Sequence, residues 1–537
     1  MDLIQVYAIA TGGVFCVLLL LNGWPWIVYL IRYLSRLASK YIVYRYVLHR
    51  HRLLGPWSLA GVLLQLIYLA GNIVCFSLGV PHVQTQRSTL SQAGLRAGTL
   101  SIINLIPLFA GAHLGTLADL LGVNLRTIRQ IHRSAGIMAV LLVSFHVMVA
   151  VGTRLSFDLH RVPDLFAVIG ASSLAFVIAL SIPIFRRLSY ELFIWAHLAL
   201  SVLAVYSIWR HLPSDTPFPR YSLYGLAGLF GFVCLVQGVI ICYRNGLFRP
   251  GRAQAEITQV YGAIRLRIQC RKPLKVNAGQ YVSLWIPSVS FWSFLQSHPF
   301  VVISWAEKPQ DHLDLFIECR RGLTQKLLYH AQKGREMHFP LLFSGPHGKS
   351  ICMDDYEKIL MIASDFGIAA QLPYLKQLIR GYNERRLHAR RVHLVWQVRD
   401  INITLAAETL LNGALDEDTL DDGWILDISI YCELDEIPQT TFGKRAHVYP
   451  GPAPLETIFH AETAEKSIRT TSVQQVDWNT QRVVEGNTIE NGSITKRDNT
   501  MLITVSANDE VRDDLRNVVR GHLCDTVRFF ELDYQPS

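Results

Sequence analysis

Long stretches without a charged residue fill the first 245 residues of this 537-residue chain and limit what it can fold into. A helix needs roughly 20 apolar residues to cross the hydrocarbon core of a bilayer. Seven charge-free windows reach or approach that length: Leu3–Ile31, Trp57–Gln86, Ala97–Ala118, Ser134–Thr153, Leu165–Phe185, Leu192–Trp209 and Tyr221–Tyr243. The sequence therefore predicts a transmembrane α-helical bundle of about seven helices over residues 1–245.

The basic residues of this half gather in alternate connections between the windows. These are the segment Arg32–Arg52, the third loop with Arg126, Arg129 and Arg133, the fifth with Arg186 and Arg187, and the exit with Arg244, Arg249 and Arg252. Cytosolic loops carry an excess of Lys and Arg, so these connections predict the cytosolic side and a cytosolic C-terminal half. The same clustering assigns the net charge of +9 to contact with membrane lipid. A nucleic-acid partner is not expected, and the oligomeric state stays open.

Four histidines lie at matched positions on two of the predicted spans. His132 and His146 bracket the fourth window, and His197 and His211 bracket the sixth, each pair 14 residues apart. That spacing is about 21 Å of helix rise and falls about 40° short of four full turns, so each pair shares one helix face. The two spans run in the same direction. His132 is therefore expected to face His197 near the cytosolic side, and His146 to face His211 near the outer side.

Two facing imidazoles at one depth are the ligands of a bis-histidine haem. A single histidine in a span is about as often a packing residue or part of a cavity lining. The repeated spacing on two parallel spans favours iron ligation and predicts two stacked haems. His113 has no counterpart at that spacing and is interpreted as a packing residue.

The second half changes character and reads as two soluble domains. Alternating strands at Ala263–Cys270 and Tyr281–Ile286 predict a small antiparallel β-barrel over residues 250–350. Residues 355–537 alternate strand and helix, which predicts a doubly wound nucleotide-binding domain. Its buried strands are expected at Ile359–Ala363, Val392–Val398, Leu426–Cys432 and, last, Met501–Val505, with a helix at Gly367–Arg380. The polar stretch 462–499 is predicted to be a flexible insertion.

Several short motifs in these domains suit nucleotide cofactors. His298, Pro299 and Phe300, followed by Ser304, suit the edge of a flavin ring, although a strand start with Phe300 in the barrel core explains them equally simply. Arg320, Gly322 and Thr324 head a predicted helix and suit a pyrophosphate; the alternative is a solvated basic turn.

Three further positions concern the second nucleotide. Gly345, Pro346 and Gly348 form a turn that would lead to a nucleotide-binding strand. A plain Gly-Pro turn without a ligand is at least as common an explanation. Gly367 lies in the strand-to-helix turn, where backbone N–H groups approach a phosphate. Arg399 ends the next strand, where its positive charge would meet a ribose 2′-phosphate. The alternative is an ordinary arginine at the end of a strand.

Taken together, these motifs resemble the fungal ferric reductase transmembrane family, which is related to the NADPH oxidases. The four histidines match its haem ligands, His298 to Ser304 match its His-Pro-Phe-x-x-x-Ser flavin motif, and Trp396 to Asp400 resemble the strand end that offers an arginine to NADPH. The resemblance implies FAD, two b-type haems and NADPH as cofactors and an extracytoplasmic ferric or cupric chelate as acceptor, with the plasma membrane as the usual location. Two stretches depart from the family pattern: Ser364-Asp365, and Ser506-Ala507-Asn508, where the family commonly has Cys-Gly-Pro.

Two rival functions remain open at this stage. One is an NADPH oxidase that makes superoxide, which requires an outer pocket admitting oxygen. The other is a haem-binding membrane protein whose nucleotide domain has degenerated, and Asp365 motivates it because a carboxylate repels a phosphate.

Overall fold

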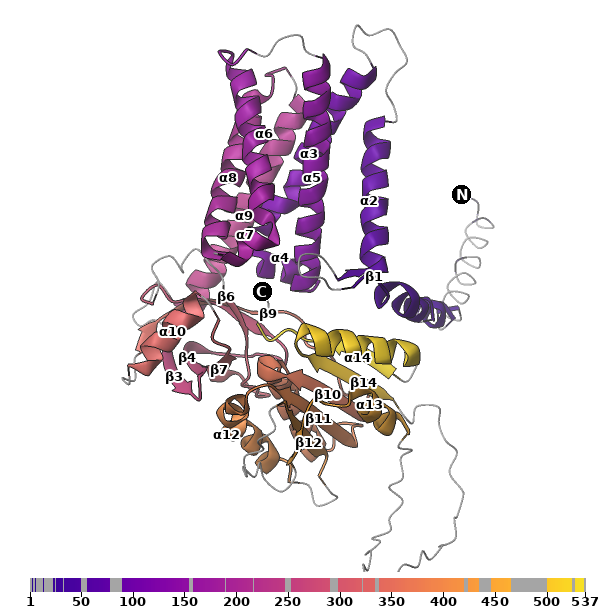
Figure 1. The fold of residues 1–537 in the computed structure, drawn as a ribbon, viewed down its shortest axis with the longest axis vertical. Coiled ribbons are helices and arrows are strands. Elements are labelled where there is room, and N and C mark those ends of the chain that lie inside the picture. Colours follow the sequence, from indigo (N-terminus) through magenta and orange to yellow (C-terminus); the bar gives the residue numbers. More distant parts are fainter. Residues whose placement is uncertain are drawn as a thin grey trace, which may run out of the picture.

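The computed structural model describes residues 23–24, 26–31, 33–49, 56–77, 89–153, 158–188, 190–215, 217–246, 253–289, 298–320, 322–333, 338–419, 424–433, 446–464, 500–523 and 527–535, and the single residues 2, 5 and 13. Within them a helical bundle stands above a β-domain and an α/β domain (Figure 1). The predicted fold class is confirmed: a membrane bundle, an antiparallel flavin-type domain and a doubly wound nucleotide-type domain.

Six helices among the described residues are long and apolar enough to cross a bilayer. They are α2 (Leu59–Ser77), α3 (Thr89–Ala110), α5 (Leu125–Thr153), α6 (Val162–Ser181), α8 (Tyr190–His211) and α9 (Pro217–Asn245). They correspond to the second to seventh predicted windows, and the first, Leu3–Ile31, lies mostly outside the described residues. Shorter elements lie between them: η1 (Ser39–Val43), β1 (Tyr46–Leu48), β2 (Trp57–Ser58), η2 (Gly111–His113), α4 (Leu114–Leu121) and α7 (Pro183–Leu188).

Small residues lie where α3 meets α5. Ala97 and Ala139 are fully buried there. The hydroxyl of Ser101 on α3 donates to the carbonyl oxygen of Ala139 at 2.9 Å, and a Cβ added to Gly94 would lie 2.7 Å from Val149. Lipid tails are as apolar as leucine, so membrane helices associate through close packing and hydrogen bonds rather than through hydrophobic burial. These residues therefore fix the distance between α3 and α5.

The next domain is built from two antiparallel sheets around one apolar core. The strands are β3 (Gln254–Val260), β4 (Ala263–Leu274), β5 (Tyr281–Trp285), β6 (His298–Val301), β7 (Gln310–Ile317), β8 (His338–Pro340) and β9 (Leu342–His347), with helix α10 (Leu323–Gln332) packed beside them. One sheet has the order β7-β4-β3-β8 and the other β6-β5-β9, and a bridge between Val302 and Leu315 connects them. Ile264, Leu266 and Ile268 alternate with more exposed residues along β4 and fill the shared core.

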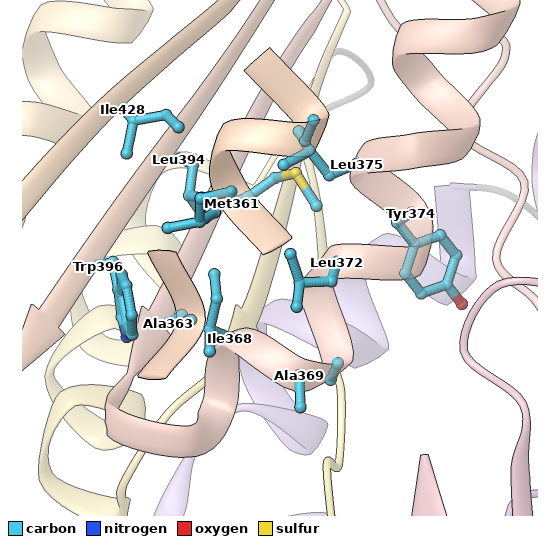
Figure 2. Close-up of a cluster of buried hydrophobic side chains, with 14 of the residues drawn as sticks. Met361, Ala363, Ile368, Ala369, Leu372, Tyr374, Leu375, Leu394, Trp396 and Ile428 are labelled. Atoms are coloured by element: carbon cyan, nitrogen blue, oxygen red, sulfur yellow. The ribbon is translucent and has the colours of Figure 1, made fainter. Parts of the chain in front are cut away.

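The last domain is a six-stranded parallel sheet with the order β13-β12-β11-β10-β14-β15. Its elements are β10 (Lys358–Ser364), η4 (Asp365–Gly367), α11 (Ile368–Asn383), β11 (Arg391–Val398), α12 (Ile401–Glu417), β12 (Leu426–Cys432), β13 (Ala446–Pro450), α13 (Leu455–Ala464), β14 (Met501–Ser506), α14 (Asp509–His522) and β15 (Val527–Glu531). Met361, Leu372, Leu375 and Trp396 pack α11 onto the sheet (Figure 2). The strand order reverses between β10 and β14, and ligands of open α/β sheets bind at such a switch point.

Two sequence expectations need correction in this domain. Met501–Val505 is expected as the last strand, but β15 follows it and pairs with β14 in parallel. Strand β13, at the other edge, is likewise not predicted, because its residues are mostly exposed and lack an apolar run. Of the predicted insertion 462–499, the first three residues belong to helix α13, and the rest lies outside the described residues.

Polar contacts join the bundle to the domains below it. The Asn245 side chain at the end of α9 bonds to the backbone of Phe343, donating to its oxygen at 2.8 Å and accepting from its nitrogen at 3.1 Å. At the start of α5, Arg126 pairs with Glu531 and, at 2.7 Å, with Asp533. The C-terminal strand is thereby tied to a membrane helix.

Replacing Gly367 with alanine should destabilise the nucleotide domain. An added Cβ would overlap the carbonyl oxygen of Ser506, a backbone atom that cannot move without shifting β14. We expect a cost of about 3 kcal/mol or more, seen as faster limited proteolysis of this domain in the full chain and a lower Tm. Gly413→Ala in α12 is the matched control, because nothing lies within 4 Å of its Cβ position. Equal resistance of the two variants would contradict the packing at Gly367.

Candidate functional site

The four membrane histidines lie in two pairs between α5 and α8. The ring centroids of His132 and His197 are 6.2 Å apart, and those of His146 and His211 are 6.4 Å apart. A metal–imidazole bond is about 2.0 Å, and the ring centre lies about 1.1 Å beyond the ligating nitrogen, so two imidazoles that held one iron between them would have centres about 6.2 Å apart. Both pairs have a spacing close to that value.

Backbone carbonyls set the tautomer of the outer pair. The Nδ1 atom of His146 lies 2.8 Å from the oxygen of Gly94, and that of His211 lies 2.9 Å from the oxygen of Pro163. A carbonyl oxygen only accepts, so each Nδ1 carries the proton and each Nε2 keeps its lone pair. A histidine oriented in this way is the usual metal ligand.

The inner pair is held differently. The Nδ1 atoms of His132 and His197 are buried and have no hydrogen-bond partner among the described residues. Gly98 of α3 and Gly111 of η2 let these helices approach the two rings of α5: an added Cβ would lie 3.1 Å from Nδ1 of His132 at Gly111 and 3.0 Å from Nδ1 of His146 at Gly98. Imidazole nitrogens buried without a partner among the described residues at the inner pair, and ring orientations fixed by carbonyl oxygens at the outer pair, both fit histidines that hold a haem.

The predicted flavin motif lies on β6 and just after it. Phe300 is buried in the barrel core, and the Ser304 hydroxyl accepts a hydrogen bond from the backbone nitrogen of Asp314 at 3.1 Å. Pro299 pairs with Ser283 of β5. The Nε2 atom of His298 is buried without a partner among the described residues, and burial lowers the pKa of His298 to about 4. The imidazole of His298 is therefore neutral, and its Nε2 atom is available to bond a ligand.

The predicted pyrophosphate motif forms the turn before α10. Gly322 has a φ of 80° and precedes the first helical residue. The Thr324 hydroxyl accepts from the backbone nitrogen of Arg320 at 2.7 Å, which closes the turn. The Arg320 guanidinium donates to Glu318 at 2.8 Å and to the Tyr534 hydroxyl at 2.9 Å. The arginine is held beside the helix N-terminus by an acid and by the C-terminal segment.

The turn of Gly345, Pro346 and Gly348 contacts the membrane domain. His347 between them places Nδ1 2.5 Å from a carboxylate oxygen of Asp119 on α4, and the backbone nitrogen of Gly348 donates to the other oxygen at 2.9 Å. Gly345 and Gly348 have φ angles of 114° and 92°. In this structure the turn that is expected on the NADPH side docks the β-domain onto α4.

The strand-to-helix turn after β10 brings Gly367 to the switch point, where its position beside Ser506 leaves no room for a side chain. Asp365 precedes it with a φ of 44°. Its carboxylate accepts from the backbone nitrogen of Arg399 at 3.0 Å and from the guanidinium at 2.7 Å. The expected repulsion of a phosphate by Asp365 is therefore offset by a direct arginine partner, and the positive charge of Arg399 is shared with that carboxylate.

Residues not singled out from the sequence complete a basic pocket of about 440 Å³. It lies between the start of α5, the turn before α10 and the C-terminal segment, and is lined by Arg126, Arg129, Arg320, Ala507, Asn508, Asp509, Arg512, Asp533, Tyr534 and Gln535. Four arginines against two acids leave it positively charged. The sequence predicts Arg126 and Arg129 only as cytosolic loop charges, because their position opposite Arg320 depends on how the domains dock.

Asp119 also escapes the sequence reasoning, although one signal marks it. It is the first acidic residue after Asp2 in the chain. An isolated acid at the end of an apolar window has few ways to keep its charge except by pairing, and its partners here are His347 and Gly348.

A helical membrane domain joined to a flavin-type β-domain and a nucleotide-type α/β domain defines the architecture of a multi-pass membrane protein that carries a two-domain nucleotide-binding half. Comparison with known proteins agrees with that architecture. Residues 97–208 match the ferric reductase like transmembrane component, and residues 253–351 match an FAD-binding domain. The chain is related to the fungal ferric reductase transmembrane components, and the predicted resemblance is confirmed.

Three relatives illustrate the extent of the similarity. Ferric reductase transmembrane component 3 of Saccharomyces cerevisiae is 24% identical over 44% of this chain and 32% of its own length. Ferric/cupric reductase transmembrane component 2 of the same yeast is 25% identical over 42% of this chain and 30% of its own length. A probable cell surface ferric reductase of Aspergillus oryzae is 25% identical over 41% of this chain and 30% of its own length. The similarity thus spans about a third of the length of these relatives.

The neutral state of His298 predicts how stability changes with pH. An unfolded histidine has a pKa of about 6.5, so between roughly pH 6.5 and 4 the unfolded chain binds a proton that the folded β-domain does not. Stability should therefore fall as pH drops through that window. The Tm of the full chain from pH 7 to 4.5 measures this, and His298→Asn should flatten the decline while exposed His312→Asn leaves it intact. An unchanged slope in His298→Asn would show that His298 is not the group responsible.

Proposed function

We propose that this protein passes electrons from cytosolic NADPH, through bound FAD and two b-type haems, to a ferric or cupric chelate on the far side of the membrane. The observation that carries the proposal is the pair of histidine sites at opposite ends of α5 and α8, each with the spacing of two ligands on one iron. When bound, FAD takes up a hydride and gives up single electrons, and haem iron carries one electron at a time.

The side chains supply position and insulation. His132 and His197 would hold the inner haem, and His146 and His211 the outer one. The 14-residue spacing separates the two sites by about 21 Å of helix rise, which divides a hydrocarbon core of about 30 Å into shorter steps. The carbonyls of Gly94 and Pro163 fix the orientation of the outer imidazoles. No side chain needs to act as a general base in this scheme.

The basic pocket supports an anionic cofactor at the cytosolic end. Arg320 stands at the N-terminus of α10, and Arg126 and Arg129 project from the start of α5 into the same pocket. Arginine is well suited to bind a diphosphate because its planar guanidinium bonds two oxygens at once. Arg129 lies three residues from His132 on α5, so a cofactor held there would be about one helical turn from the inner haem site.

The acceptor is proposed from the relatives, which are named as ferric or ferric/cupric reductases. The name of the Aspergillus oryzae relative, a cell surface protein, supports the plasma membrane as the location.

Purified full-length protein loaded with FAD and haem should develop a reduced b-type haem spectrum when NADPH is added, and should reduce a ferric chelate supplied from the opposite side of a vesicle. The chemistry follows from cofactor potentials rather than from an acid or base on the chain. Superoxide as the main product would support the oxidase instead. Failure to reduce haem with FAD bound would support a degenerate nucleotide domain.

His197→Ala should remove the inner haem and leave about half the haem content of the wild type, because one axial ligand of that site is lost while the outer pair is untouched. Haem per protein, measured by the pyridine haemochrome method, gives the result directly. Exposed His160→Ala is the control and should keep the full content. Retention of both haems in His197→Ala would refute the pairing.

A further inference from the structure

The segment before α2 forms a helix that lies across the foot of the bundle. Residues 33–38 are helical, η1 continues them to Val43, and β1 follows. In Figure 1 this indigo helix runs roughly perpendicular to α2, on the side of the bundle that faces the β- and α/β domains. A helix that crosses one end of the spanning helices is placed where the interface of a surrounding bilayer would lie.

The side chains of this helix are apolar, aromatic and basic, without an acid. Tyr33, Leu34, Leu37, Tyr41 and Val43 are exposed, with Leu34 and Tyr41 more than half accessible. No Asp or Glu occurs between Asp2 and Asp119, whereas this segment alone carries Arg36, Lys40 and Arg45. Exposed apolar and aromatic residues interleaved with Lys and Arg are the composition of helices that lie in a membrane interface.

The basic groups are arranged with the aromatic rings. The guanidinium of Arg36 lies 5.9 Å from the ring centre of Tyr33, and the ammonium of Lys40 lies 5.7 Å from that of Tyr41. Tyrosine rings favour the headgroup level of a bilayer, and basic side chains extend their charge to the same level. The basic groups and the tyrosine rings therefore fit the same level of a bilayer, that of the headgroups.

The end of the segment is bonded to the nucleotide domain. The Tyr44 hydroxyl donates to the backbone oxygen of Phe529 at 3.2 Å, and the Tyr46 hydroxyl donates to Asp513 on α14 at 3.0 Å. Arg516 of α14 donates to the Tyr46 hydroxyl at 2.5 Å and stacks over both tyrosine rings. Burial raises the pKa of Tyr46 to about 12, so the hydroxyl keeps its proton for these bonds.

We propose that residues 33–48 form a lipid-held strut. The exposed side chains of residues 33–43 enter the headgroup region of the cytosolic leaflet, where Arg36, Lys40 and Arg45 bind anionic lipid headgroups. Tyr44 and Tyr46 then fix α14, and with it the nucleotide domain, at a set position against the membrane. An anionic bilayer is the favoured occupant because the surface combines exposed apolar and aromatic side chains with basic groups and no acid, and lies across one end of the spanning helices.

Hydrogen–deuterium exchange of the full-length protein tests this in nanodiscs of phosphatidylcholine alone and of phosphatidylcholine with about one third phosphatidylserine. Each basic residue near an anionic surface is worth a factor of about five in binding, so with Arg36 and Lys40 both engaged exchange in residues 33–43 should slow by up to roughly 25-fold in the anionic discs. The double variant Arg36→Gln, Lys40→Gln should lose that difference. The control, Lys275→Gln with Lys308→Gln on the β-domain, should keep it.

A second variant separates lipid binding from its transmission. Tyr44→Ala with Tyr46→Ala removes the hydrogen bonds to Phe529, Asp513 and Arg516 and the two rings beneath the Arg516 guanidinium, but leaves the lipid-facing residues 33–43 intact. The lipid dependence of exchange should then persist in residues 33–43 and disappear from α14. Equal exchange of residues 33–43 in neutral and anionic discs would overturn the proposal, as would slowing that appears only with added cytosolic protein. Lipid dependence of α14 that survives the double variant Tyr44→Ala, Tyr46→Ala would overturn the role of the strut.

Discussion

Close packing of α3 against α5 is the interaction on which the arrangement of this protein depends. Gly94 admits Val149, and Gly98 and Gly111 admit the rings of His146 and His132. A side chain at any of these glycines would push α5 away or rotate it. Because α5 also carries Arg126 and Arg129 in its first turns, the same contact sets the depth of both histidine sites and the position of the basic pocket.

Paired charges then join the domains at the membrane surface. Burial favours the neutral form of Glu531, yet Arg516 and Arg126 hold its pKa below the usual range. Asp119 and His347 form a second junction on α4. Glu531 is the buried member of the first junction, and removing its arginine partners would leave its charge uncompensated, so this junction resists separation of the domains. The second junction is half-exposed on the Asp119 side and contributes less. The contacts that hold the domains together thus lie beside the residues proposed to hold the cofactors.

Periodicity and composition could predict much of this fold, because each depends on neighbours along the chain. The spans follow from uncharged windows, and the facing of His132 with His197 follows from helical spacing on two spans of one direction. Strands β10, β11 and β14 are rich in apolar residues and buried almost throughout, and β12 is buried at most positions. The edge strand β13 lacks that signal because its side chains meet solvent.

Contacts between distant residues were beyond such reasoning. The carboxylate of Asp365 by itself would repel a nucleotide phosphate, but Arg399, 34 residues later, pairs with it. The turn at Gly345 looks like part of a nucleotide site until Asp119, 228 residues before His347, is found bonded to it. In each case the residue type was noticed, and the missing information was its partner, which only the docking of separate elements supplies.

The arginines at the start of α5 show how one feature can satisfy two demands. Positive charge on cytosolic loops orients the bundle wherever in the loop it lies, so orientation alone does not require Arg126 and Arg129 to face Arg320. Their side chains also line one pocket together with Arg320. That pocket lies at the end of α5 where an anionic cofactor would be closest to the inner histidine pair. The charge predicted to orient the helix in the membrane is thereby also available to bind the phosphates of the proposed electron donor.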